Sequence, residues 1–314
     1  MNIIKNRYWY FFVSLLVIIP GIVFMVLNAT SKGVVLPLAE DFTGGSLFEV
    51  EFSGALPAVD KIDALYAKYS TAANPIDDPV VQPLGEDAYA IRSKQMTEET
   101  KAQILAELAD LSGGEVTVLN FTSVSPAVGQ EVTNAAGIAI AMAAIAILLY
   151  IWYAFRGVEH AYRFGTAAII AMLHDVLVVI GVEAILGYFL GWEADALFLT
   201  ALLTVIGFSV HDSIVVFDRV RENSGIYRRV EFEKMVNHSI IQTLDRSINT
   251  QLTVMFTLTA LALFGGDTIR HFVVILLVGI FSGTYSSIFN AAPILVVWEN
   301  REWTRWFRRK EAAI

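Results

Sequence analysis

The sequence predicts an α-helical membrane bundle of six transmembrane helices that carries a small α+β domain of ferredoxin-like type outside the membrane. Three observations predict it: an apolar composition, six long apolar runs, and one acidic segment of mixed pattern between the first two runs. Hydrophobic residues make up 55% of the 314 residues and charged residues 17%, with a mean hydropathy of +0.57. These values exclude an ordinary water-soluble protein.

Six apolar runs are long enough to cross a bilayer, whose core of about 30 Å needs about 20 helical residues. They lie at 8–27, 135–155, 164–186, 196–217, 248–264 and 272–297. The first run follows Lys5 and Arg7 as a signal peptide would. It exceeds the usual apolar length of about 7–15 residues and lacks a small-residue cleavage site, so we expect a retained signal anchor.

The positions of the basic residues predict the orientation, because short cytoplasmic loops accumulate Lys and Arg. Of the connections between runs, those on one side carry nearly all the bases, and the opposite ones, 187–195 and 265–271, offer only Arg270. Both termini are therefore expected in the cytoplasm. The predicted parts are 1–28, an extracytoplasmic domain 29–134, helices two to six over 135–298 with a cytoplasmic loop near 218–239, and a basic tail 299–314.

Charge and cysteine content narrow the function classes. The segment 29–134 holds 16 Asp and Glu against six Lys and Arg, whereas the other bases flank apolar runs, which argues against a nucleic-acid partner and for contact with membrane lipid. The chain has no Cys, which excludes disulfides and thiolate metal sites. We expect no metal and no cofactor.

The outside domain reads as strand, helix, strand, strand, helix, strand. The expected strands are 47–52, 80–83, 89–93 and 116–122, and the expected helices are 57–69 and 97–111, the order of a ferredoxin-like split βαβ unit. Its carboxylates are scattered and it contains no His, so no catalytic group is expected. Its acidic faces are either simply solvated or a docking surface for an unfolded chain or a partner.

Ionisable residues inside the apolar runs are the strongest functional signal. His174 and Asp175 begin HDVLVVIG in the third run, and His211 and Asp212 begin HDSIVVFD in the fourth, a degenerate repeat. A carboxylate inside a bilayer costs at least about 2.5 kcal/mol, so it is usually neutralised and usually functional. We expect Asp212 to lie near the inner surface.

The start of the fifth run offers Asp212 a partner. If that helix begins near 240, Arg246 lies at the depth of Asp212, and with Asn249, Thr253 and Thr257 it forms one polar stripe. Ionised Asp212 would be held by Arg246 and protonated Asp212 released, which makes a proton-responsive switch. Interhelical hydrogen bonds with a snorkelling Arg246 remain the alternative. In the sixth run Gly279, Gly283, Ser287 and Asn290 are best explained by close helix packing.

Several motifs together resemble the SecF branch of the SecD/SecF family. They are DFTGGS at 41–46, SVSPAVG at 123–129, HDVLVVIG at 174–181, VIGFSVHDSIVVFDRVREN at 205–223, QTLDRSINT at 242–250, LFGG at 263–266 and GTYSSIF at 283–289. The resemblance covers nearly the whole chain.

The resemblance implies the fold of the resistance-nodulation-division superfamily and a non-enzymatic subunit of the Sec translocon that uses the proton gradient to draw preproteins outward. It implies SecD as partner, with SecYEG and subunits like YajC and YidC in the wider assembly, and a location in the bacterial cytoplasmic (inner) membrane. It matches Asp212 and Arg246 to proton-responsive residues and assigns no step to His174, Asp175 or His211. A small-molecule exporter and a purely structural assembly factor remain open. An intramembrane aspartyl protease is disfavoured, because Ser209, Val210 and His211 precede Asp212 instead of glycines.

Overall fold

The computed structural model describes residues 2–31, 33–71, 75–77, 79–156 and 161–302, and it divides the chain into two compact units. The helical unit contains the chain up to Leu36, then Ile140–Trp192, and the chain from Leu197 onward. The α/β unit contains Pro37–Ala139 together with the short segment Glu193–Ala196.

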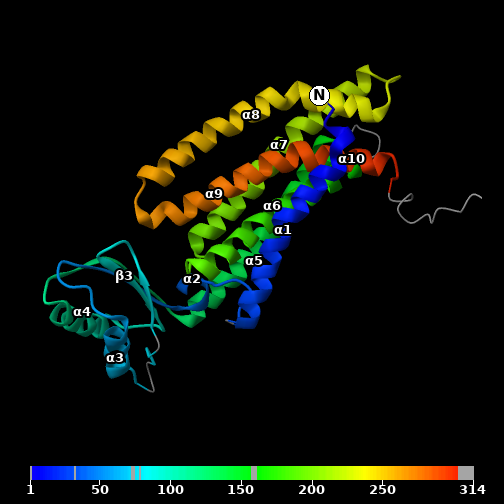
Figure 1. The fold of residues 1–314 in the computed structure, drawn as a ribbon. Helices are drawn as coiled ribbons and strands as arrows, with labels where there is room; N and C mark the ends of the chain where they lie inside the picture. The colour runs from blue at the N-terminus through cyan, green and yellow to red at the C-terminus, as the bar shows by residue number, and fades with distance from the viewer. Residues whose placement is uncertain (1, 32, 72–74, 78, 157–160, 303–314) are drawn as a thin grey trace, which may run out of the picture. The chain divides into compact units, whose positions relative to one another are not determined.

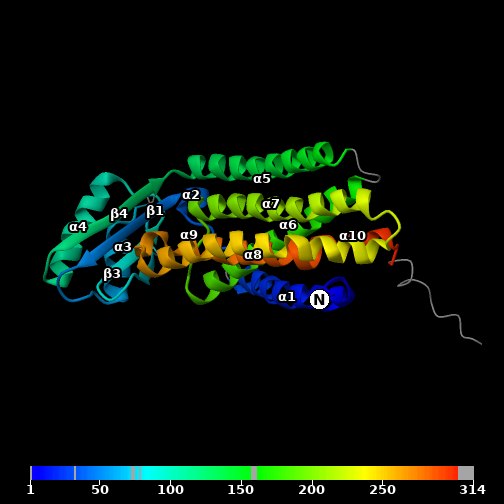
Figure 2. The same cartoon turned by 90° about the horizontal axis from the view of Figure 1, so that it is seen from above.

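Six helices are long and apolar enough to cross a membrane, which confirms the predicted multi-pass bundle (Figures 1 and 2). The sixth span is built from three consecutive helical pieces, the middle one a π-helical turn. The elements are η1 (Ile4–Asn6), α1 (Arg7–Ser31), α5 (Pro126–Ala154), α6 (Tyr162–Phe189), α7 (Ala196–Ile226), α8 (Phe232–Phe264), α9 (Asp267–Ser286), η2 (Ser287–Ala291) and α10 (Ala292–Glu299).

The centre of the helical unit is formed by α6, α7 and the sixth span, which bury about half of their apolar windows, whereas α1, α5 and α8 bury about a tenth or less. Helix α1 lies against α6, and α9 lies against both α6 and α8 (Figure 1). The α1–α6 contact is very close, because a Cβ on Gly21 would stand 2.5 Å from Gly181 Cα. The exposed apolar faces of the outer helices suit a lipid environment.

Several helices run further than the apolar runs indicated, and α5, for example, begins at Pro126 instead of near 135. Helix α8 begins at Phe232 instead of near 240, and α7 continues to Ile226, so the connection between them covers only 227–231. The extra turn of α7 carries charged pairs three residues apart, Asp218 with Arg221 and Arg219 with Glu222, which stabilise a helix outside the apolar layer. Arg246 therefore lies about four turns into α8 by helix geometry.

The α/β unit has the predicted ferredoxin-like order. A short helix, α2 (Glu40–Thr43), precedes β1 (Gly45–Phe52), α3 (Val59–Tyr69), β2 (Val80–Pro83), β3 (Ala88–Ser93), α4 (Glu98–Ser112) and β4 (Val116–Val124). The strands form one antiparallel sheet in the order β2-β3-β1-β4. This order confirms the split βαβ prediction.

Alternation along β1 explains the core of this unit. Phe48, Val50 and Phe52 are buried and pack with residues of both long helices, including Tyr66 and Leu108. Helix α4 begins after Thr97, whose Oγ1 accepts a hydrogen bond from Thr100 N at 3.3 Å and so caps the helix.

The segment Glu193–Ala196 joins α6 to α7, yet it belongs to the α/β unit. Ala39 N donates to Ala194 O and Ala194 N donates to Pro37 O, both at 2.9 Å, which makes a short parallel bridge. Asp41 Oδ2 also accepts a hydrogen bond from Ala196 N at 3.0 Å. The two helices that carry the His-Asp dipeptides are therefore connected through a piece of the α/β unit.

Candidate functional site

Asp212 lies inside the helical unit and is held by serine hydroxyls from two other helices. Asp212 is on α7 and is only 4% exposed. Oδ1 accepts a hydrogen bond from Ser247 Oγ of α8 at 2.8 Å, and Oδ2 accepts one from Ser287 of η2. Hydrogen bonds that stabilise a carboxylate in a low-dielectric interior are strong and necessary, because an unpaired buried charge is very costly.

Asp175, on α6, is fully buried and more densely bonded. Ser282 and Ser286 of α9 each donate to it at 2.6 Å, and Ser209 of α7 donates at 2.5 Å. The neighbouring His174 contributes Nδ1 at 2.9 Å from Oδ1. Three helices therefore converge on this carboxyl group.

The two carboxyl groups are linked through α7 and the sixth span, each of which contributes to both of them. We call the two carboxyl groups, together with the five serines that donate to them, the serine–carboxylate centre. Ser209 lies three residues before Asp212 on α7, and Ser286 and Ser287 are consecutive in the sixth span. A Cβ on Gly283 would lie 3.3 Å from Ser209 Cα, so glycine allows α9 to approach α7 at this level. The centre comprises Asp175, Asp212, Ser209, Ser247, Ser282, Ser286 and Ser287.

Arg246 does not occupy the place that the sequence suggested. Arg246 is exposed. Within the described residues, the next residue along α8, Ser247, donates to Asp212 in its place. Successive helical residues point about 100° apart, so only one of the two can face α7 in a given orientation of α8. Asn249 is also exposed, as is His211, which lines a cavity with Gly207 and Phe208.

Sequence reasoning missed most of the hydroxyl donors and one acidic residue. Ser287 was interpreted as a small packing residue, and Ser282 and Ser286, which lie four residues apart in the same run, were not singled out. Glu183 was visible as an acid within the third apolar run. In the structure it is fully buried on α6, with Oε2 2.8 Å from His271 Nε2 of α9.

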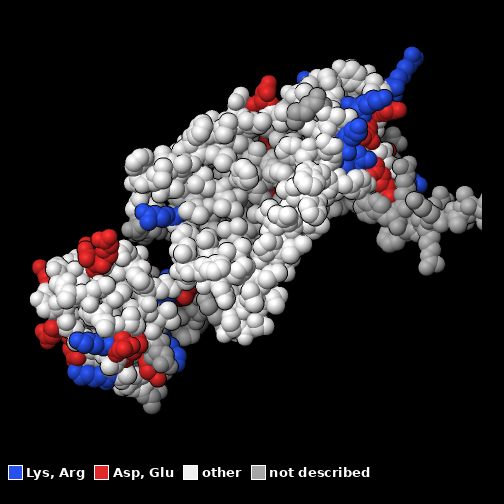
Figure 3. Space-filling view, in the orientation of Figure 1, with Lys and Arg blue, Asp and Glu red and all other residues white. Residues whose placement is uncertain are grey.

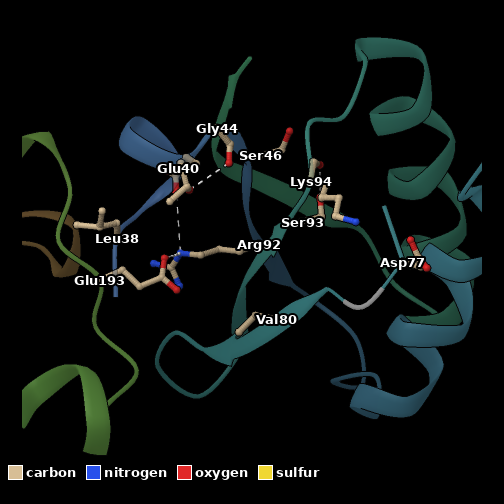
Figure 4. Close-up of a pocket in the computed structure, with 11 residues that line it drawn as sticks. Leu38, Glu40, Gly44, Ser46, Asp77, Val80, Arg92, Ser93, Lys94 and Glu193 are labelled. Atoms are coloured by element: carbon tan, nitrogen blue, oxygen red, sulfur yellow. Dashed lines mark hydrogen bonds and ion pairs between the residues drawn. The ribbon is translucent and has the colours of Figure 1, made fainter. Parts of the chain in front are cut away.

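The α/β unit holds a separate polar cavity of about 310 Å³ beside the DFTGGS segment (Figure 4). Arg92 Nε lies 3.1 Å from Glu193 Oε2 and 3.9 Å from Glu40 Oε2. Burial raises the pKa of Glu40, and the charge of Arg92 opposes this only in part. The arrangement attaches Glu193 to the sheet.

Metal chemistry has no visible site in the part of the chain that the structure describes, where no three metal-binding side chains come together. Charged side chains are scarce along the face of the helical unit shown in Figure 3, and basic residues gather at the end that carries the N-terminus. They include Arg7, Arg219, Arg221, Arg228, Arg229, Lys234 and Arg301.

Comparisons with known proteins agree on one family. The family model described as "Protein export membrane protein SecD/SecF, C-terminal" matches residues 103–301. The chain is 53% identical over 311 residues to a protein translocase subunit SecF of Anaerolinea thermophila, covering 98% of this chain and 97% of the relative. It is 47% identical to a SecF of Thermobaculum terrenum, covering 99% and 98%.

Solved structures show the same relationship. A crystal structure of SecDF from Thermus thermophilus superimposes with a TM-score of 0.79 at 30% identity, covering 96% of this chain and 39% of that one. A SecDF structure in a super-membrane-facing form gives a TM-score of 0.66 at 30% identity, covering 98% of this chain and 40% of the other. With six spans, a ferredoxin-like unit and these matches over nearly its full length, the chain belongs to the SecD/SecF family of protein export membrane proteins.

Proposed function

We propose that this chain is the proton-coupled, non-enzymatic half of a membrane complex that helps complete the export of preproteins. The observation that carries the proposal is the serine–carboxylate centre, in which two buried carboxyl groups are satisfied by hydroxyl and imidazole groups and not by a fixed cation. Because no fixed positive charge holds these carboxyl groups in the ionised form, their protonation can respond to a change in the surrounding helix packing.

Protonation of Asp212 would change the contacts between helices. The ionised carboxylate accepts two hydrogen bonds, whereas the protonated group donates one of its own and binds its former donors more weakly. Because Ser247 and Ser287 belong to different helices, a change at Asp212 alters the preferred packing of α7 against α8 and η2. A proton crossing about 100 mV supplies about 2.3 kcal/mol, enough to favour one of two packings strongly.

Arg246 fits this scheme as the partner in a second packing. A rotation of α8 by about 100° about its axis would exchange Ser247 for Arg246 in front of Asp212. The ion pair would form only with ionised Asp212, whereas the Ser247 hydroxyl can bond to Asp212 in either protonation state. His174, Asp175, His211 and Asn249 would support the polar surroundings of this exchange.

The wider complex is inferred from the relatives. Some related proteins are single chains named SecDF, one of which aligns with this chain over only 37% of its own length. We therefore infer a SecD-type partner that supplies the remaining helices, in contact with SecYEG, YajC- or YidC-like subunits and the moving preprotein. The basic end of the helical unit supports cytoplasmic termini and an extracytoplasmic α/β unit.

The SecD-type partner is tested by purifying the tagged chain in a mild detergent and identifying the chains that accompany it. We expect a larger membrane protein of the same family in equal amount. Isolation of this chain alone from a membrane that contains such a protein would contradict the partnership.

The proton-coupling role is tested with Asp212→Asn in membrane vesicles that contain the complete complex. We expect the part of preprotein export that depends on an imposed proton gradient to be lost, because Asn keeps the shape but cannot be protonated. Asp218→Asn is the matched control, since Asp218 is an exposed acid on the same helix. Unchanged gradient-dependent export in Asp212→Asn would contradict proton coupling and favour a structural role.

A further inference from the structure

A second buried ionisable pair lies in the helical unit, apart from the serine–carboxylate centre. Glu183 of α6 is 0% exposed, and its Oε2 lies 2.8 Å from Nε2 of His271 at the beginning of α9. Its other oxygen, Oε1, has no hydrogen-bond partner among the described residues. A fully buried carboxyl group with one oxygen unsatisfied is expensive to maintain, which points to a use beyond packing.

The surroundings of the pair are apolar on one side and polar on the other. The rings of Trp192 and Phe198 flank the imidazole of His271, with centroids 4.6 and 6.5 Å away. From α1, Asn28 donates Nδ2 to the carbonyl oxygen of Ala184 at 3.0 Å, and its own Oδ1 is buried without a partner. Arg270, the nearest charged residue along α9, is exposed. Within the described residues, Glu183 and His271 are thus the ionisable groups that face each other here.

His271 gives this pair a route to water. Its side chain is 17% exposed, whereas that of Glu183 is fully covered. The pair lies near the C-terminal end of α6 and the N-terminal end of α9, the end of the helical unit at which α1 also ends. Under the proposed orientation this is the extracytoplasmic end.

The same two helices carry Asp175 deeper in the bundle. Glu183 is eight residues after Asp175 on α6, about 12 Å along the helix axis. On α9, His271 precedes Ser282, a donor to Asp175, by 11 residues or about 16 Å. The outer pair and the inner centre are therefore two levels of one helix–helix interface.

A cavity of about 470 Å³ extends along this interface from the level of His174 to that of Val182, and neither Glu183 nor His271 is among its lining residues. Its outer part is lined by apolar residues such as Val182, the residue before Glu183, and its inner part by Ser14, Ser282 and His174. His174 is nine-tenths buried, and its Nε2 lacks a hydrogen-bond partner, while its Nδ1 contacts Asp175. An imidazole with one nitrogen on a carboxyl group and the other unpartnered beside a cavity has the arrangement of a proton shuttle.

We propose that Glu183 and His271 form an outer proton-exchange site that takes protons from the extracytoplasmic water and delivers them through His174 to Asp175. One proton enters at His271 and is held between Nε2 and the Glu183 carboxylate. It then leaves Glu183 for a water molecule that enters the cavity, and that water passes a proton to His174 Nε2. His174 releases the proton on Nδ1 to Asp175 Oδ1, so one proton moves inward and no charge is left behind on the shuttle.

The apolar part of the cavity has a role in this scheme. Water needs polar partners to remain in a cavity, and Val178, Val182 and Leu277 offer none. The two levels are therefore connected only when water enters briefly, which limits leakage of protons while the complex is idle.

The inference rests on the proposed proton coupling, and it is tested with Glu183→Gln and His271→Gln in vesicles that contain the complete complex. Gln at 271 keeps an N–H group for Glu183 but cannot titrate. We expect both variants to reduce gradient-driven export at least fivefold at neutral external pH. Acidifying the extracytoplasmic side of the vesicles should restore part of the export rate, since a higher proton activity on that side compensates for a lost exchange site.

Asn28→Ala is the control, because it removes a buried polar side chain at the same level that cannot carry a proton. A purely structural role of the pair predicts that His271→Gln retains the wild-type rate and its pH profile, and this result would overturn the proposal. If Asp212→Asn abolishes gradient-driven export and the two Gln variants do not, only the outer site is refuted. If Asp212→Asn also leaves export unchanged, the proposed function itself fails.

A spectroscopic measurement keeps the proposal testable if a variant assembles poorly. Infrared difference spectra of the purified full chain, recorded on a change of external pH, should contain a carboxyl band that is absent in Glu183→Gln and shifted in Glu183→Asp. A band pattern identical in wild type and Glu183→Gln would show that Glu183 does not exchange its proton, and would overturn the proposal.

Discussion

Arg7 and Glu302 link the beginning of α1 to the chain beyond α10. Arg7 Nη2 donates to Glu302 Oε1 at 2.6 Å, and Tyr8 donates its hydroxyl to Oε2 at 2.5 Å. Burial alone would raise the pKa of Glu302, but the hydrogen bonds and the charge of Arg7 outweigh it and lower the pKa. This carboxylate therefore stabilises the helical unit in its ionised form.

The stability of the purified chain should depend on pH through Glu302. Because the folded pKa is lowered, the contribution is present above the usual Glu pKa of about 4.3 and is lost as pH falls through the folded value. Glu302→Gln should lower the free energy of unfolding near pH 7 by about 1–3 kcal/mol. The decrease of this free energy at acid pH should also be less steep in the variant. Thermal unfolding in detergent measures both effects, with the exposed Glu231→Gln as control. An equal loss of stability with falling pH in wild type and Glu302→Gln would contradict this role.

At this scale the sequence could identify two of the buried carboxyl groups but not the groups to which they are bonded. The two His-Asp dipeptides stood out because ionisable groups are rare in apolar runs, and both aspartates are buried. The side chains of Arg246 and Ser247 point about 100° apart around α8. Which of them faces Asp212 therefore depends on the rotation of α8 about its axis, and this rotation is set by packing against the other helices. The serines were ambiguous because small residues serve both helix packing and hydrogen bonding.

Among the elements, the contact of α1 with α6 depends on two glycines. A side chain on Gly181 would meet the backbone of Gly21, with 2.9 Å between the added Cβ and Gly21 Cα. Backbone atoms cannot move away by a change of rotamer, so the helices would have to separate.

Gly181→Ala should therefore destabilise the helical unit by about 1–3 kcal/mol. Gly207→Ala is the matched control on α7, because nothing lies within 4 Å of a Cβ at that position. Thermal unfolding of the purified chain in detergent compares them. Equal midpoints for the two variants would mean that α1 and α6 do not pack as described.

Helix existence was predictable, whereas helix ends were not. Apolar length alone located all six spans, and alternation located the four strands. Helix α8 extends eight residues beyond the predicted start because residues 232–239 contain no Gly or Pro to end a helix. The π-helical turn η2, which carries Ser287, has no sequence signature that distinguishes it from α-helix.

For the molecule as a whole, the connection between α6 and α7 is the feature that the sequence did not indicate. Glu193–Ala196 belongs to the α/β unit and is held there by backbone hydrogen bonds. Neither composition nor periodicity indicated this role, since the bonds join residues about 155 positions apart.

Arg92 should hold this segment in place through Glu193. Arg92→Gln removes the ion pair and leaves the buried Glu40 without a nearby positive charge, so the backbone hydrogen bonds of Ala39, Ala194 and Ala196 should open more often. We expect hydrogen exchange of these amides to accelerate by up to about tenfold. Lys101→Gln, which removes an exposed pair on α4, is the control. Unchanged exchange in Arg92→Gln would show that Arg92 does not secure the segment.

The coupling of proton entry to preprotein movement is tested most directly by following one partly exported preprotein in vesicles after the ATP-driven step has been stopped. A proton gradient is then imposed in either direction, with wild-type chain or Asp212→Asn in the complex. We expect forward movement only with wild type and only when the extracytoplasmic side is acidic. Equal forward movement in Asp212→Asn, or movement independent of the direction of the gradient, would contradict proton coupling through Asp212.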